Sequence, residues 1–410
     1  MRVSTSQVFR NGVDSIQRSQ QDLSRTQLQL GSGKRILSPS DDPSGAVKSL
    51  QLTSAAGKLE QYERNALSVM QRLRSTETVL TSVVDGLQRV RELVVQGNNG
   101  SQTNETRAMI AGEIRQSLDE LLHLANTRDA NGEYLFAGLS SSTQPFARIG
   151  NGAVEYLGDE GQRAVQVSAV RTVPLGDSGS RVFMDIPNGT GSLQALDEPA
   201  NTGTALISVE GVVDPAAWAP DTYTVRFDTN SAGQLVYRVA GAASGPLVPA
   251  SGDIDDAPAY VSGQAIVFNG ARVTIQGEPQ ADDAFTVEPS AKQDLFSTYA
   301  QIVAALEAPV ADGSSRARLN NAMNRALLDL DQALGRLLET RTSLGARMNT
   351  VETQSRINED QLLQVKSTLS EIQDLDYAEA ISRFNLQQTA LQAAQQTFVQ
   401  VQRLSLFNFL

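Results

Sequence analysis

The sequence predicts an α+β fold: an elongated antiparallel α-helical coiled-coil bundle built from both chain ends, with an inserted small β domain. Three observations predict it. Apolar residues recur at coiled-coil spacing in both flanks of the chain, and short segments typical of strands occur in the middle. Residues 140–290 also hold 17 of the 31 glycines and 11 of the 14 prolines, so the flanks must be mostly helical.

The N-terminal flank predicts three helices. Through residues 9–30 the spaced positions advance by alternating steps of four and three, and the pattern stops at the Gly-Ser-Gly of 31–33. A second pattern runs through 52–94, and a helix of this kind extends roughly 65 Å at about 1.5 Å per residue. We expect a shorter helix over 104–128. A lone helix of this length does not fit a compact domain, so the pattern indicates an elongated bundle.

The C-terminal flank matches the N-terminal one. The same spacing runs through 327–372, with polar residues at Arg341, Ser355 and Asn358, and it restarts over 380–401. The simplest arrangement folds the chain back on itself, so that the two flanks lie antiparallel and both termini meet at one end.

The middle of the chain predicts β structure. Asn269-Gly270 is a typical two-residue hairpin turn between two apolar segments. A small antiparallel sandwich or barrel is the expected arrangement. The strand candidates are 153–156, 165–170, 222–227, 235–239, 265–268 and 272–275.

Charge divides the chain in the same way. Residues 140–290 carry 18 Asp and Glu against 7 Arg, a net charge of −11 out of −12 for the whole chain. We therefore expect a solvated acidic middle between two nearly neutral helical arms, whose surfaces pack easily against copies of themselves. The predicted domains are 1–42 with 375–410 (terminal helical assembly domain), 43–139 with 291–374 (helical-bundle domain) and 140–290 (inserted β-rich outer domain).

The composition argues against enzymatic and nucleic-acid functions. The chain has no cysteine and a single histidine, His123, which excludes thiolate metal sites and makes a histidine-based relay improbable. The acidic balance does not suit phosphate binding. Residues 31–35 lack the pattern of a phosphate-binding loop, and the acidic runs at 253–256 and 282–283 lack calcium-loop spacing. We expect no catalytic, cofactor-binding or metal-binding residues, and no cofactor.

The N-terminus has no apolar core of a signal peptide, and no apolar run is long enough to span a bilayer, so we expect neither cleaved secretion nor membrane insertion. Both ends are amphipathic, and terminal helices of this size are marginal in water. This predicts that they fold as they assemble with partner chains. The candidate assembly residues are Phe9, Val13, Ile16, Leu23, Leu30, Ile36, Leu37, Phe384, Leu391, Phe398, Val401, Leu404, Leu406, Phe407 and Phe409.

Two segments at opposite ends resemble a known family. Residues 33–46, Gly-Lys-Arg-Ile-Leu-Ser-Pro-Ser-Asp-Asp-Pro-Ser-Gly-Ala, resemble the N-terminal signature of flagellins, and 376–384, Asp-Tyr-Ala-Glu-Ala-Ile-Ser-Arg-Phe, resemble their C-terminal signature. Within that family, 131–138, Pro145-Phe146 and the ending 404–410 look more like the members that join hook to filament. Pro43 suits the first turn of a helix in this signature, after the acidic pair at 41–42.

The resemblance implies a structural component of the bacterial flagellum. It implies a protein that is exported through the flagellar secretion apparatus without a cleaved signal peptide and is extracellular. The implied partners are a hook-proximal junction protein, the filament flagellin, copies of the chain itself and an export chaperone on the C-terminal segment. Nucleic acid is not among them.

Two alternatives stay open on the sequence alone. The nearest is the filament flagellin itself, which the residues at 131–138 and 404–410 disfavour. The other belongs to a different class: the β insert could be an adhesin-like binding module, for which Trp218 in a proline-flanked loop is a candidate contact residue.

Overall fold

The computed structural model describes residues 5–150 and 152–407. The chain divides into two compact units. The first comprises Met1–Ala66, Val167–Val170 and Thr353–Leu410, and the second comprises Leu67–Gln166 and Arg171–Glu352. These limits differ from the three predicted domains, because the long helices continue from one unit into the other.

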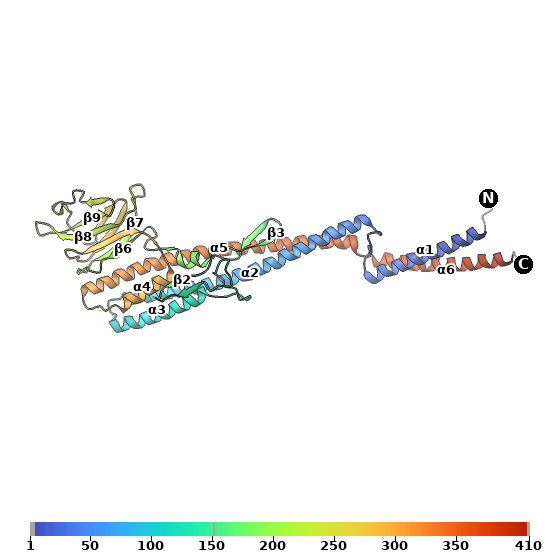
Figure 1. Cartoon of the computed structure of the whole chain (residues 1–410), viewed down its shortest axis with the longest axis horizontal. Coiled ribbons are helices and arrows are strands. Elements are labelled where there is room, and N and C mark those ends of the chain that lie inside the picture. The colour runs from blue at the N-terminus through green and yellow to red at the C-terminus, as the bar shows by residue number, and fades with distance from the viewer. Residues whose placement is uncertain (1–4, 151, 408–410) are drawn as a thin grey trace. The chain divides into compact units, whose positions relative to one another are not determined.

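Helices account for both flanks of the described chain (Figure 1). The five helices that the spacing predicts are present, and the one predicted over 104–128 ends at Ala125. The helices are α1 (Thr5–Ser32), α2 (Pro43–Gly97), α3 (Asn104–Ala125), α4 (Leu295–Glu307), α5 (Gly313–Gln373) and α6 (Tyr377–Phe407).

Helix α4 was not predicted from the sequence. Asp294 caps its N-terminus, where the carboxylate accepts a hydrogen bond of 2.7 Å from the backbone N–H of Ser297. Its buried residues Leu295, Tyr299, Ile302 and Leu306 advance by steps of four, three and four, but the helix has only 13 residues. A pattern this short does not distinguish a helix from a strand or a loop segment in the sequence.

Within the first unit, the two flanks run antiparallel, as predicted. Phe9 of α1 lies against Phe398 of α6, with ring centroids 5.0 Å apart, and the Thr26 hydroxyl donates to Gln387 Oε1 at 2.8 Å. The adjoining parts of α2 and α5 are also joined, since Lys366 pairs with Glu60 at 2.8 Å.

The polar positions in the long apolar pattern each have a partner. In the second unit, Arg341 pairs with Glu77 at 2.6 Å. In the first unit, the Ser355 hydroxyl donates to Glu63 at 2.6 Å, and the Asn358 amide donates to the backbone carbonyl of Val167 at 2.9 Å. Directional contacts at single positions of such a seam fix which residues face each other.

The second unit has an apolar core of leucine, isoleucine and valine from its helices, together with a cluster of aromatic rings. Phe183 lies at the centre of the cluster, 5.1 Å from Phe136, 5.5 Å from Phe146 and 6.3 Å from Phe296 between ring centroids. These residues come from segments far apart in the sequence, so the cluster fastens the irregular segments to α4.

The middle of the chain contains an antiparallel β-sandwich, which confirms the predicted architecture. A five-stranded sheet of order β10-β9-β8-β13-β6 and a three-stranded sheet of order β11-β12-β7 share one apolar core. Its strands are β6 (Leu193–Asp197), β7 (Leu206–Val212), β8 (Tyr223–Thr229), β9 (Leu235–Gly241), β10 (Gly245–Val248), β11 (Ala265–Phe268), β12 (Ala271–Gln276) and β13 (Ala284–Pro289). The predicted hairpin joins β11 and β12, where Asn269 and Gly270 have φ of 41° and 80°.

The strands before β6 do not belong to the sandwich. They form short pairs outside it, so residues 140–290 hold more than one β structure. Strand β5, for example, pairs with strand β14, which follows β13 in the sequence. These elements are β1 (Phe146–Arg148), β2 (Val154–Tyr156), β3 (Ala164–Ser168), β4 (Arg171–Pro174), β5 (Ile186–Pro187) and β14 (Lys292–Gln293).

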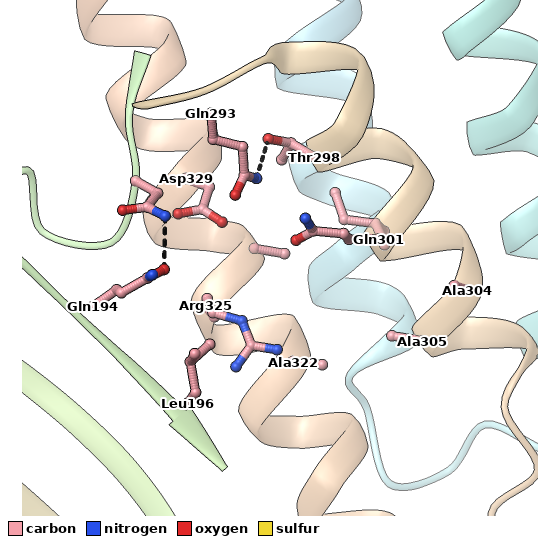
Figure 2. Close-up of a pocket in the computed structure, with 13 residues that line it drawn as sticks. Gln194, Leu196, Gln293, Thr298, Gln301, Ala304, Ala305, Ala322, Arg325 and Asp329 are labelled. Atoms are coloured by element: carbon pink, nitrogen blue, oxygen red, sulfur yellow. Dashed lines mark hydrogen bonds between the residues drawn. The ribbon is translucent and has the colours of Figure 1, made fainter. Parts of the chain in front are cut away.

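Polar residues of α5 hold the sandwich in the second unit. Asn321, which is buried, accepts from the backbone N–H of Ile207 at 3.0 Å and donates to Ala205 at 3.2 Å. One turn and two turns further on, Arg325 and Asp329 border a cavity of about 480 Å³ (Figure 2). Burial raises the pKa of Asp329. Hydrogen bonds to backbone atoms, which are directional, therefore set how the sandwich sits on α5.

Candidate assembly interface

The first unit contains both family-like signatures, and they meet where the helices change direction. Helix α1 ends at Ser32, and Gly33 follows with a φ of +69°, a conformation that favours glycine. The chain then crosses the segment between α5 and α6. The Arg35 N–H donates to Gln373 at 2.8 Å, and the Leu375 N–H donates back to Gly33 at 3.0 Å. The two connectors are thus tied by backbone hydrogen bonds.

The adjacent aspartates of the N-terminal signature have separate roles. One carboxylate oxygen of Asp41 accepts from the N–H groups of Leu37 and Ser38, at 2.9 and 3.0 Å, which fixes the turn. Asp42 caps α2, because its carboxylate accepts from the Gly45 N–H at 2.8 Å. The N–H groups of Ser38 and Leu37 lower the pKa of Asp41, and that of Gly45 lowers the pKa of Asp42.

The contact between α1 and α6 holds eight of the fifteen predicted assembly residues. Seven of them are half-buried in the single chain and lie on the helix faces turned toward each other, and the eighth and outermost, Phe9, is 48% exposed. The half-buried residues are Val13, Ile16, Leu23, Leu30, Phe384, Leu391 and Phe398. A seam of two helices buries each side chain on one side only, so these residues first hold α1 to α6 within one chain.

The two predicted residues of the connector differ from each other. Ile36 is buried, and a Cβ on Gly45 would lie 2.7 Å from its Cδ1, so it packs under the start of α2. Leu37 is 39% exposed and stays available for contact. The remaining predicted residues lie beyond the described side chains: α6 continues to Phe407, but the side chains of Val401, Leu404, Leu406 and Phe407 are not described, and Phe409 lies outside the described residues.

Further apolar residues on the surface of the first unit were missed by the sequence reasoning. They do not occupy the coiled-coil positions of the sequence pattern. A large apolar residue outside those positions was the signal that could have identified them. On the helices of this unit, the residues with the largest exposed fractions are Leu28 at 62%, Leu50 at 72%, Leu363 at 71% and Leu386 at 72%. Large apolar side chains exposed along several helices of one unit mark a surface for association.

The structure also places the residues that the sequence singles out as candidates for chemistry or binding. His123 is exposed on α3, and no three His, Asp or Glu side chains of residues 5–150 and 152–407 are placed to hold a metal ion. Trp218 is half-buried against the sandwich core, 5.9 Å from the ring of Tyr223. Among the described helices, none has the length and apolar character needed to cross a membrane.

Comparison with known proteins identifies the family. Residues 3–141 match the bacterial flagellin N-terminal helical region, and residues 327–410 match the bacterial flagellin C-terminal helical region. Over 409 residues the chain is 26% identical to flagellar hook-associated protein 3 of Escherichia coli strain K12, covering 100% of this chain and 99% of that protein. A flagellin of Escherichia coli O127:H6 is 29% identical over 248 residues, covering 59% of this chain and 41% of the flagellin.

A solved structure agrees with this result. The crystal structure of flagellar hook-associated protein 3 from Legionella pneumophila is 37% identical, with a TM-score of 0.76, and the match covers 78% of this chain and 98% of that one. The chain therefore belongs to the flagellin family, among the flagellar hook-associated protein 3 sequences.

Proposed function

We propose that this chain is a structural subunit of the bacterial flagellum that forms the junction between hook and filament and assembles through its two terminal helices. The observation that carries the proposal is the extent of the similarity. Hook-associated protein 3 aligns with the chain from end to end, whereas the flagellin aligns over little more than half of it. The filament flagellin is thus the less favoured alternative.

The construction of the first unit supports assembly through both ends. Helices α1 and α6 bury their apolar residues against each other only in part, and several large apolar side chains remain exposed beside them. A two-helix pair of this kind is marginal alone, so further burial against neighbouring chains would stabilise it. A contact between two different surfaces that repeats without closing gives a helical layer, as a tubular junction requires.

The partners follow from the proposed position. Copies of the chain would surround the axis, with the hook-proximal junction protein on one side and filament flagellin on the other. The C-terminal segment would be covered by an export chaperone before assembly, and the chain would leave the cell through the flagellar secretion apparatus to become extracellular. The non-enzymatic role fits the family. Trp218 gives the adhesin alternative no support, because its ring packs against the sandwich.

Deletion of the gene in the source bacterium tests the proposal. We expect hooks without filaments by electron microscopy, together with intact flagellin released into the medium. Complementation with the full chain should restore filaments. Filaments that are missing without released flagellin would identify the chain as the filament subunit instead. Normal filaments on the deletion strain would refute both structural roles.

A further inference from the structure

A groove runs along the face of α1 that points away from α6. Its volume is about 750 Å³, and it lies between α1 and the connector to α2. Along α1 it is lined by Gln17, Gln21, Ser24 and Leu28, and Leu37 of the connector forms its opposite wall. All five residues are exposed. The four helix positions follow steps of four, three and four, so they form one continuous stripe.

The groove is electrically balanced. Its charged lining residues are Arg25 and Asp41, and they pair with each other at 2.6 Å. The rest of the lining is amide, hydroxyl or apolar. A partner that suits this groove should therefore carry neither a net charge nor an unpaired one, because a charge placed there would lose hydration without gaining a counter-charge.

The outer face of α6 has this character. Residues 384–402 contain no Asp, Glu, Lys, Arg or His. Leu386, Ala390, Ala393 and Thr397 are all exposed on the side of α6 that points away from α1, and they follow the same steps of four, three and four. The first of them is 72% exposed. The helix pair thus presents two uncharged stripes of equal length on its opposite sides.

We propose that the groove on α1 of one copy receives the outer stripe of α6 from a second copy of the chain. This inference rests on the proposed function and names the surfaces that meet. Leu386 would lie in the apolar part of the groove, formed by Leu28 and Leu37. The contact uses two different surfaces of the same chain, so each added copy exposes a new groove or a new stripe and the series continues.

The positions of the large residues fix the orientation. If Leu386 packs on Leu28, the two stripes overlap along their full length only when the helices run antiparallel, which places Ala390 beside Ser24 and Thr397 beside Gln17. Since α6 already runs antiparallel to α1 of its own chain, all copies then point the same way along the assembly. A tubular layer with distinct hook and filament ends needs this common polarity.

Disulfide cross-linking in assembled flagella tests the contact. The chain has no cysteine, so the introduced thiols are the only ones that copies of the chain can use to cross-link to each other. A Leu28→Cys/Leu386→Cys variant, expressed in the deletion strain, should give a ladder of dimers, trimers and larger species on a non-reducing gel after mild oxidation of isolated flagella. A disulfide requires Cα atoms within about 7 Å. Either single substitution should lose the ladder, and dilute unassembled protein should stay monomeric.

A matched control uses Gln388, which is exposed on the same turn of α6 but points to another side of the helix. We expect no ladder from Leu28→Cys/Gln388→Cys. The pair Ser24→Cys/Ala390→Cys repeats the test with small residues, in case the leucine substitutions disturb folding, and should cross-link as well.

The outcomes separate this inference from the proposed function. Dimers from Leu28→Cys alone would mean that two grooves face each other, and an equal ladder from the Gln388 control would mean an unspecific contact; both overturn the inference. Filaments and swimming without a ladder from either cysteine pair would overturn it while the junction role stands. Cross-links to flagellin instead of to a second copy would also overturn it.

Discussion

Asn358 offers the sharpest test of how polar contacts order the long helices. Its side chain is 1% exposed and makes two hydrogen bonds: the amide donates to Val167 at 2.9 Å and accepts from Gln354 at 3.0 Å. Asn358→Ala leaves a buried carbonyl and a buried amide without a partner, each costing about 1–3 kcal/mol. We expect a loss of about 2–6 kcal/mol. With a slope of about 3 kcal/mol per molar urea, the unfolding midpoint falls by on the order of 1 M.

The assay is urea unfolding followed by circular dichroism at 222 nm, with hydrogen exchange to localise the effect. Asn358→Leu keeps the branched side-chain shape and the number of heavy atoms but removes the polar contacts, so it should recover part of the helix stability while exchange at residues 167–170 stays fast. Gln361→Ala, at an exposed position of the same helix, is the control. An Asn358→Leu protein as stable as the wild type and equally protected at 167–170 would refute the reasoning.

Three further changes probe other elements. Gly33→Ala should destabilise the first unit by about 1 kcal/mol and reduce filament attachment, because φ is +69° and the new Cβ would lie 2.9 Å from Tyr377 Oη; unchanged unfolding and motility would contradict this. The Ser315 hydroxyl and N–H lower the pKa of Asp312 from 3.8 to about 2. The ionised Asp312 carboxylate therefore stabilises the fold above pH 3.8, and this stabilisation is lost as the pH falls toward 2. Asp312→Asn should remove this part of the acid unfolding curve followed by circular dichroism, and identical curves for the variant and the wild type would contradict the prediction. Phe183→Ala should lower the free energy of unfolding in urea by about 3–5 kcal/mol, because the ring is fully buried among three others. Phe183→Leu should lower it clearly less, and equal losses for the two variants would refute the packing argument.

The helices and several strands could be predicted from local patterns. The spacing through 52–94 and 327–372 requires one continuous apolar face, and a helix is the structure that provides it. Asn269-Gly270 identifies its hairpin because both residues need positive φ. In contrast, β6, β7 and β13 were not predicted. Each pairs with a strand far along the chain, β6 with β13 and β7 with β12, and the identity of such a partner is absent from the strand's own sequence.

For the proposed assembly interface, the sequence selected residues of the two terminal helices but did not tell which of their faces are free. It selected Ile16, Leu23 and Leu391 as assembly residues because they are apolar at regular spacing. In the structure these residues face the other helix of the same chain, and Leu28 and Leu386 remain exposed. A periodic pattern predicts which residues are buried, but it does not predict which partner buries them.

The sequence by itself determined the α+β class, the antiparallel helical arms, the C-terminal end of α1 and the family to which the chain belongs, since these depend on periodicity, on turn residues and on short local motifs. The tertiary structure alone decided how the sandwich is held by Asn321, how the two connectors cross beside Gly33, and which side of α1 forms a groove. Those features arise from contacts between residues distant in the chain, and such contacts exist only once the backbone has brought the residues together.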